Sequence, residues 1–226
     1  MKKTIFSFVV VLVVTGTGFL PFTLLSQEVI PLAAQEVTAL PAPQTDGGMP
    51  LMQALKNRHT SREFSGKELS AQQLSNLLWA ACGINRPDLK KRTAPSAMNY
   101  QEIDVYVSTA KGLFLYNAEK HNLVQILKED IRDKTGIQDF VKTAPVNLIF
   151  IADFTKMSKS DDKGKEAYAM ADAAFISENV YLFCASDGLA TGVRAYIDKD
   201  ILGKAMNLKP GQYIMLGQSV GYPKEK

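Results

Sequence analysis

Histidine and cysteine are scarce in this sequence, since each occurs only twice in 226 residues. The few that are present have neither the spacing of a metal-binding cluster nor that of a nucleophile–base triad. We therefore predict no metal site and no catalytic side chain of this kind. Long blocks of like charge are also missing, and the net charge is only +3. No nucleic-acid partner is expected, because an extended nucleic-acid surface needs clustered cations.

The two cysteines, Cys82 and Cys184, both lie in apolar stretches with helical periodicity. This pattern predicts two buried thiols. A disulfide between them stays open as an alternative if the protein is exported.

The first 26 residues look like an export signal and not like part of a folded domain. Lys2 and Lys3 precede an apolar run from Ile5 to Val14, and a charged start before an apolar core is typical of a secretory signal. Cleavage is expected after Ser26 or Ala34. An uncleaved anchor is the alternative, because the apolar segment approaches the roughly 20 residues of a bilayer span. The protein is thus expected to be periplasmic or secreted, with membrane contact only if the segment is uncleaved.

Residues 27–48 contain prolines and alanines without a hydrophobic period, which predicts a linker. Residues 49–226 then have the length of one domain, enough to bury a sizeable core.

Strands and helices follow one another in mixed order along this domain. Alternating or β-branched runs predict strands at 102–109 and 146–153. A helix is predicted at Ser70–Cys82, with Ser70 as N-cap and Gly83 as stop. The longest helix, Lys163–Asp187, has apolar residues on more than one face and should be central. These expected apolar positions are Ala167, Met170, Ala171, Ala174, Phe175, Val180 and Phe183. Because strict βαβ alternation is missing, we predict an α+β fold with helices around a mostly antiparallel sheet.

The stretch RHTSREF, residues 58–64, carries two arginines four positions apart just after a short predicted helix. Arginine offers a planar fork of donors that matches phosphate oxygens, and on a helix end Arg58 and Arg62 would face the same side. His59 and Thr60 add a ring nitrogen and a hydroxyl group. The cluster predicts a phosphate site. A solvated helix end, with cations near the negative end of the helix dipole, is the alternative.

A second polar stretch, TAPSAMNYQ at residues 93–101, reads as a loop. Pro95 fixes its backbone, Ser96 offers a hydroxyl, and Asn99 offers an amide that donates and accepts. Such a loop can line the edge of a flat heteroaromatic ring. Taken alone, it also fits an ordinary turn.

Together the two stretches resemble the FMN-dependent nitroreductase family. Residues 58–64 are similar to the segment that binds the flavin phosphate and ribityl chain, with Thr60 in place of the usual serine. Residues 95–101 are similar to a loop that reaches the flavin ring from the partner subunit, so the resemblance implies a homodimer. Residues 188–202 are similar to the segment whose backbone N–H meets flavin N5. The resemblance runs from Leu51 to Pro223, and it implies cofactor contacts from Arg58, His59, Thr60, Arg62, Pro95, Ser96, Ala97 and Asn99.

Two further residues are cofactor candidates. An amide at about the place of Gln138 binds the flavin's pyrimidine edge in the family, although an exposed helix residue is the alternative. Arg194 lies in the N5 segment, where a cation would stabilise reduced flavin. An ion pair with a nearby carboxylate is the alternative for Arg194.

The sequence also departs from the family pattern. The proline and tryptophan that usually follow the loop's glutamine are replaced by Glu102 and Ile103, which is more similar to the branch of azoline-oxidising dehydrogenases of modified-peptide pathways. The usual C-terminal cation pair on the phosphate has only Lys224 and Lys226 as weak counterparts.

The resemblance implies a two-electron oxidoreductase that uses FMN on a small nitro, quinone, enone or azoline substrate, with NAD(P)H as a possible electron donor. Nicotinamide cofactors are scarce outside the cytoplasm, so an exported enzyme would need another donor or act as an oxidase. An exported protein that binds flavin or another small ligand without turnover is the alternative.

Overall fold

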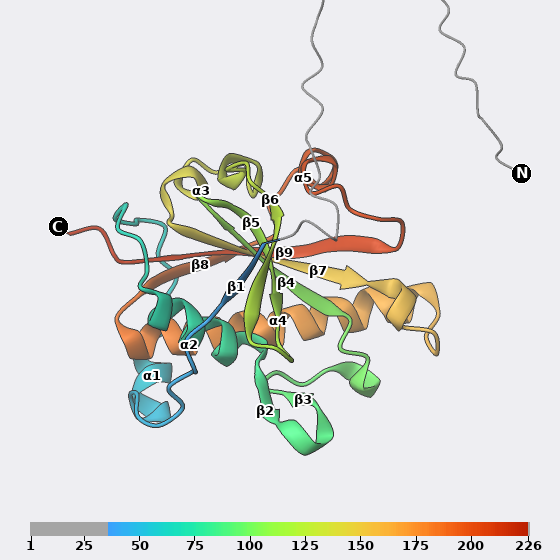
Figure 1. Ribbon diagram of the computed structural model, residues 1–226, viewed down its shortest axis with the longest axis horizontal. Coiled ribbons are helices and arrows are strands. Elements are labelled where there is room, and N and C mark those ends of the chain that lie inside the picture. Colours follow the sequence, from blue (N-terminus) through green and yellow to red (C-terminus); the bar gives the residue numbers. More distant parts are fainter. Residues whose placement is uncertain (1–35, 226) are drawn as a thin grey trace, which may run out of the picture.

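A seven-stranded antiparallel sheet forms the centre of the computed structural model, which describes residues 36–225 (Figure 1). From one edge to the other, the strands are β1 (Val37–Ala39), β6 (Asn122–Leu127), β5 (Gly112–Asn117), β4 (Ile103–Thr109), β7 (Val146–Asp153), β9 (Gln212–Gly221) and β8 (Ala190–Arg194). Each neighbouring pair is antiparallel. The α+β prediction with an antiparallel sheet is therefore confirmed.

Five α-helices and a small hairpin surround the sheet within residues 36–225 (Figure 1). The helices are α1 (Leu51–Asn57), α2 (Ala71–Cys82), α3 (Phe140–Thr143), α4 (Asp162–Asp187) and α5 (Lys199–Ala205). The hairpin pairs β2 (Ile84–Arg86) with β3 (Lys91–Arg92). None of the helices in residues 36–225 has the length and apolar character that a membrane crossing needs.

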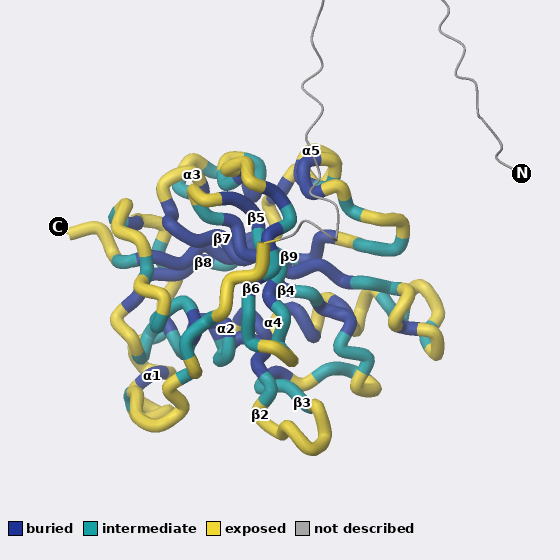
Figure 2. Tube along the Cα trace, in the orientation of Figure 1, coloured by how far each residue is buried: buried dark blue, intermediate teal, exposed yellow. Residues whose placement is uncertain are grey.

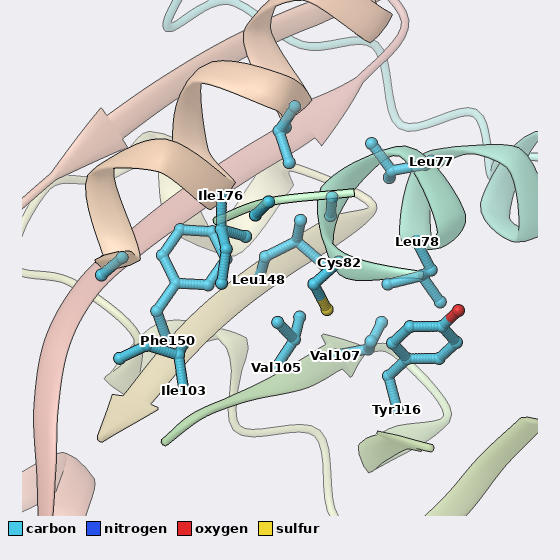
Figure 3. Packing of buried hydrophobic residues seen from close by; sticks show 14 of the residues in the cluster. Leu77, Leu78, Cys82, Ile103, Val105, Val107, Tyr116, Leu148, Phe150 and Ile176 are labelled. Atoms are coloured by element: carbon cyan, nitrogen blue, oxygen red, sulfur yellow. The ribbon is translucent and has the colours of Figure 1, made fainter. Parts of the chain in front are cut away.

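Strand β7 is buried on both faces because helices cover the sheet from both sides. Leu148 and Phe150 point into the core cluster beneath α2 and α4, as Figure 3 shows. The alternate residues Ile149 and Ile151 pack into a second cluster with Leu202 of α5. Side chains alternate across a strand, so a strand between two helical layers buries both sets of side chains and is mostly apolar. Asn147 is a buried polar exception. Figure 2 shows the resulting buried centre and the exposed rim of loops.

The predicted limits of α2 are confirmed. The Ser70 hydroxyl accepts the Gln73 N–H at 3.1 Å, and the Gln73 side chain reaches back to the Ser70 N–H at 3.2 Å. This reciprocal capping box satisfies amides that the first turn leaves free. Gly83 follows as the C-cap, where an added Cβ would lie 2.5 Å from the Trp79 side chain.

Helix α4 buries a different face from the one that we predicted. Five of the expected apolar positions are exposed, and only Val180 of the seven is fully buried. The exposed ones are Ala167, Met170, Ala171, Ala174 and Phe175. The buried face instead carries residues such as Asp172, Ile176 and Tyr181. Phe175, at 48% exposure, is thus part of an apolar surface on a single chain.

The described part of the expected linker, residues 36–48, packs on the domain. Val37–Ala39 pairs with β6 as strand β1. Farther on, the Pro41 carbonyl accepts the Ser75 hydroxyl at 2.6 Å and the Ala42 carbonyl accepts the Gln72 side-chain amide at 2.9 Å. These residues are therefore not a free linker. The predicted signal segment, residues 1–26, lies outside the described residues.

The two cysteines are buried free thiols, as predicted, and no disulfide joins them. Cys82 faces the core beneath α2 (Figure 3). Burial raises the pKa of the Cys82 thiol to about 11.

Candidate active site

The predicted phosphate segment follows α1 as extended chain. Helix α1 ends at Asn57, and Arg58 has φ −57° and ψ 122°. The two arginines are therefore not presented by a helical turn, and this part of our reasoning was wrong. Arg58 is half-buried, whereas His59 and Arg62 are exposed. The His59 Nδ1 atom lies 2.9 Å from the Asn57 carbonyl oxygen.

Tyr181 of α4 holds this segment in place. The Thr60 hydroxyl lies 2.8 Å from the Tyr181 hydroxyl, and the Arg58 guanidinium lies 5.2 Å from the centre of the Tyr181 ring. The same hydroxyl accepts the backbone N–H of Val193 in β8 at 3.0 Å. One phenol thus joins α4, β8 and the arginine segment. Tyr181 could not be singled out from the sequence, where its only signal was a phenol hydroxyl next to apolar residues of the longest helix.

Strand β8, within the segment expected to meet flavin N5, lies against the arginine segment. The Ser61 N–H donates to the Thr191 carbonyl at 2.8 Å. A Cβ on Gly192 would lie 2.8 Å from the Ser61 carbonyl oxygen. Glycine therefore permits the close approach of two backbones at this point. The C-terminal tail also reaches the segment, because the Lys224 N–H donates to the Glu63 carbonyl at 3.3 Å. Lys226 lies outside the described residues.

Arg194 ends β8 as a buried cation that is surrounded by neutral acceptors. It is 5% exposed, and its four hydrogen bonds go to the carbonyl and hydroxyl oxygens of Thr135, to Ser219 and to Asn147, at 2.8–3.0 Å. The ion pair that we considered as an alternative is not what holds it. Burial lowers the pKa of the guanidinium to about 10, so the group stays charged at neutral pH. An anion bound nearby would gain from this charge.

Gln138 lies three residues after Thr135, which accepts two of the hydrogen bonds from Arg194. Its side-chain oxygen is buried without a protein partner among residues 36–225. An amide oxygen in that state is an acceptor that a ligand N–H can satisfy. Its loop is tied to the arginine segment through a ring contact, since Phe140 lies 6.0 Å from Phe64 and 5.9 Å from Arg194. The pyrimidine edge of a flavin carries such an N–H, so the orphaned acceptor fits the expected cofactor.

The second predicted segment, Pro95–Asn99, lies elsewhere in the same chain. It is bonded to α4 through Asp172, whose carboxylate accepts the Ala97 N–H at 2.8 Å. Asp172 and Tyr181 are nine residues apart, which is about 14 Å along a helix. One chain therefore brings together Arg58–Arg62, β8, Gln138 and Arg194, but not the Pro95–Asn99 loop.

A buried carboxyl pair supports this loop, and sequence reasoning missed its role. Glu102 is fully buried and Asp172 is 3% exposed. Burial, together with the nearby carboxylate of Asp172, raises the pKa of Glu102 to about 7. The signal in the sequence was the acid that stands where the family has a proline.

The assembled groups suit the binding of an anionic, planar ligand with an N–H edge. They offer exposed and half-buried cations for a phosphate, a buried cation and an orphaned amide acceptor. Within residues 36–225 no group of histidine, cysteine, aspartate and glutamate side chains is arranged to hold a metal ion.

Comparisons with known proteins agree with this geometry. The model of the "Nitroreductase family" matches residues 55–222. A candidate nitroreductase of Methanocaldococcus jannaschii is 29% identical over 182 residues, which cover 76% of this chain and 90% of that protein. The crystal structure of a candidate nitroreductase from Ralstonia eutropha is similar with a TM-score of 0.82 and 37% identity, over 93% of this chain and all of that one.

A component of the Escherichia coli microcin synthetase McbBCD complex, solved with a truncated microcin precursor bound, has a TM-score of 0.65. The match covers 88% of this chain and 84% of that one. At 19% identity this likeness concerns the fold alone.

Proposed function

The chain belongs to the nitroreductase family, and from this premise we propose that it is an FMN-dependent oxidoreductase acting on a small organic substrate. FMN, when bound, supplies two-electron hydride chemistry at its N5 atom. The observation that carries the proposal is the orphaned Gln138 oxygen, in the loop whose Thr135 accepts two hydrogen bonds from the buried cation Arg194.

Each part of the site then has a task. Arg58 and Arg62, with His59 and Thr60, bind the phosphate through charge-assisted hydrogen bonds. Gln138 accepts the N–H of the pyrimidine edge. Arg194 offsets the negative charge that a two-electron reduction leaves on the ring, because a fixed cation in a buried site is worth more than one in water.

The protein needs no side-chain nucleophile for this chemistry. Its own contribution is to orient the ring, to hold the phosphate end and to keep a cation near the ring. Tyr181 supports the first two of these tasks, because it ties Thr60 and Val193 to α4. We propose NAD(P)H as the electron donor and a nitro, quinone, enone or azoline compound as the acceptor.

We also propose that the active form is a homodimer. The Pro95–Asn99 loop lies about 14 Å along α4 from Tyr181, so it reaches a flavin site more readily in a partner than in its own chain. An apolar surface on α1 and α4 supports this proposal, since exposed apolar patches mark interaction sites. Its larger members are Leu51, Met52, Leu55, Met170 and Phe175, and Met98 of the loop is also exposed.

A redox titration of the flavin-loaded protein tests the proposed activity. We expect NADPH or NADH to bleach the flavin absorbance and an electron acceptor such as a quinone to restore it. Flavin that is bleached by dithionite but by neither nucleotide would contradict NAD(P)H as donor. Flavin that no acceptor re-oxidises would favour a binding protein without turnover.

A further inference from the structure

Glu102 is a fully buried carboxyl group at the end of the Pro95–Gln101 loop. Its Oε2 atom accepts the Ser96 hydroxyl at 3.2 Å. The Ser96 oxygen in turn accepts the backbone N–H of Gln101 at 2.8 Å. The carboxyl group therefore closes the loop by joining its beginning to its end through one serine.

Asp172 of α4 anchors the same loop from the other side. Its Oδ2 atom accepts the Ala97 N–H at 2.8 Å, and the side chain is 3% exposed. Both carboxyl groups line one cavity of only about 10 Å³. The two neighbouring acids thus hold the middle and the ends of the loop. The Tyr100 hydroxyl, 3.0 Å from that of Ser160, and the Gln101 side-chain amide, which donates to the Lys90 carbonyl at 2.9 Å, are further side-chain contacts of the loop.

The loop needs such anchors because its backbone is strained. Met98, Asn99 and Gln101 have φ angles of 49°, 57° and 50°. Residues with a side chain occupy this left-handed region at a cost, and they stay there only when surrounding contacts hold them. Met98 is also 60% exposed, so its side chain contributes little to holding the loop.

The surroundings of Glu102 favour its protonated form. Asp172 approaches from α4, and Arg92 of β3 is the cation that lines the same cavity. Arg92 directs one guanidinium nitrogen to the Ile103 carbonyl at 3.0 Å. Two adjacent buried carboxyl groups do not readily ionise together. In agreement, burial and Asp172 raise the pKa of Glu102 from 4.5 to about 7.

We propose that Glu102 and Asp172 are positioning residues that anchor the Pro95–Gln101 loop from both sides, with Glu102 in its protonated form, and so hold it in the shape with which it completes the flavin site of a partner chain. The last step rests on the proposed function. Asp172 accepts the Ala97 N–H, and the pH dependence of the loop comes from Glu102.

Opening of the loop is coupled to the loss of the Glu102 proton. The closed loop has the raised pKa, and in an open, solvated loop Glu102 regains its ordinary value. Closing therefore takes up a proton between about pH 4.5 and 7, and the loop loses stability as the pH rises through that window. Above the upper limit both states are ionised, and the loss levels off.

Amide hydrogen exchange in the full-length protein without flavin measures this directly. The reporters are the N–H groups of Ala97 and Gln101, after correction for the intrinsic pH dependence of exchange. We expect their protection to fall by up to about tenfold for each pH unit between pH 5 and 7, and then to level off. In Glu102→Gln, which cannot ionise, protection should stay constant over this range.

Two further variants keep the experiment decisive. Asp172→Asn removes the neighbouring charge but keeps an acceptor for the Ala97 N–H, so the transition should move to lower pH. Glu225→Gln removes an exposed acid far from the loop and should behave as the wild type. An identical pH dependence in the wild type and in Glu102→Gln, or in the wild type and Asp172→Asn if Glu102→Gln fails to fold, would overturn the proposal.

Adding FMN separates this proposal from the proposed function. If the loop serves a partner's flavin site, saturating FMN should slow the exchange of the Ala97 and Gln101 amides further. The expected pH dependence without any effect of FMN would support the carboxyl pair as the loop's anchor, while contradicting the loop's part in the flavin site.

Discussion

Removing the two arginines of the phosphate segment should weaken FMN binding strongly while leaving the fold intact. Arg62 is exposed. Arg58 is half-buried over the Tyr181 ring at 5.2 Å. The two residues should therefore have similar effects on affinity but different effects on stability.

The expected losses of FMN affinity and of folding stability follow from these contacts. A charge-assisted hydrogen bond to phosphate contributes roughly 1.5–3 kcal/mol, so each alanine variant should lose about tenfold to a hundredfold in affinity, and the double variant a hundredfold or more. Arg62→Ala should change the free energy of unfolding by less than about 0.5 kcal/mol. Arg58→Ala should cost about 0.5–1 kcal/mol more, because it loses the contact with the ring of Tyr181.

The assay combines a flavin titration with the melting temperature of the flavin-free protein. Arg86→Ala serves as a matched control, because it removes the same charge from an exposed arginine of the small hairpin. Unchanged FMN affinity in the Arg58 and Arg62 double variant would refute the phosphate assignment. An equal loss of affinity in Arg86→Ala would attribute the effect to net charge. A large drop in melting temperature for Arg62→Ala would mean that the arginine holds the chain in place.

Four other variants probe separate contacts. As the pH rises from about 4.5 to 7, ionisation of Glu102 should lower the free energy of unfolding by about 3 kcal/mol. Denaturant titrations at several pH values should show this decrease in the wild type but not in Glu102→Gln. Gln138→Leu should weaken FMN binding by about tenfold without lowering the melting temperature of the flavin-free protein, since its oxygen has no protein partner; a lower melting temperature would contradict this. Tyr181→Phe should destabilise the flavin-free protein by about 1–3 kcal/mol, because two hydrogen bonds of a buried hydroxyl are lost; unchanged stability would deny its linking role. Phe175→Glu should shift sedimentation towards monomer, and a dimer of unchanged affinity would exclude this face of α4 as the interface.

The elements with a clear hydrophobic period could be predicted from the sequence. Strand β7 is apolar at six of its eight positions because both of its faces are covered. Helix α2 carries its own capping box and stop. Strand β1 could not be predicted, because a three-residue edge strand has too few residues to show a period.

Which face of α4 is buried could not be predicted from the sequence, for another reason. Alanines and large apolar residues occur on several of its faces, and hydropathy does not distinguish a core from a surface that a second chain would cover. The buried face includes Asp172 and the hydroxyl of Tyr181, which are polar because they bond to the loop and to β8.

The candidate site residues Arg58, Gln138 and Arg194 were named from short motifs and family resemblance, and their role stays a prediction. The residues that support the candidate segments were not found from the sequence. Glu102 and Tyr181 act through contacts with residues distant in the sequence, in the case of Tyr181 with Thr60, 121 positions away. Such pairs become visible only once the chain is folded.

The cofactor content of the purified protein is the decisive measurement. We expect a yellow protein that releases FMN, and not FAD, in stoichiometric amount when it is denatured. A protein that is colourless, and that binds no FMN when the cofactor is added in excess, would contradict it.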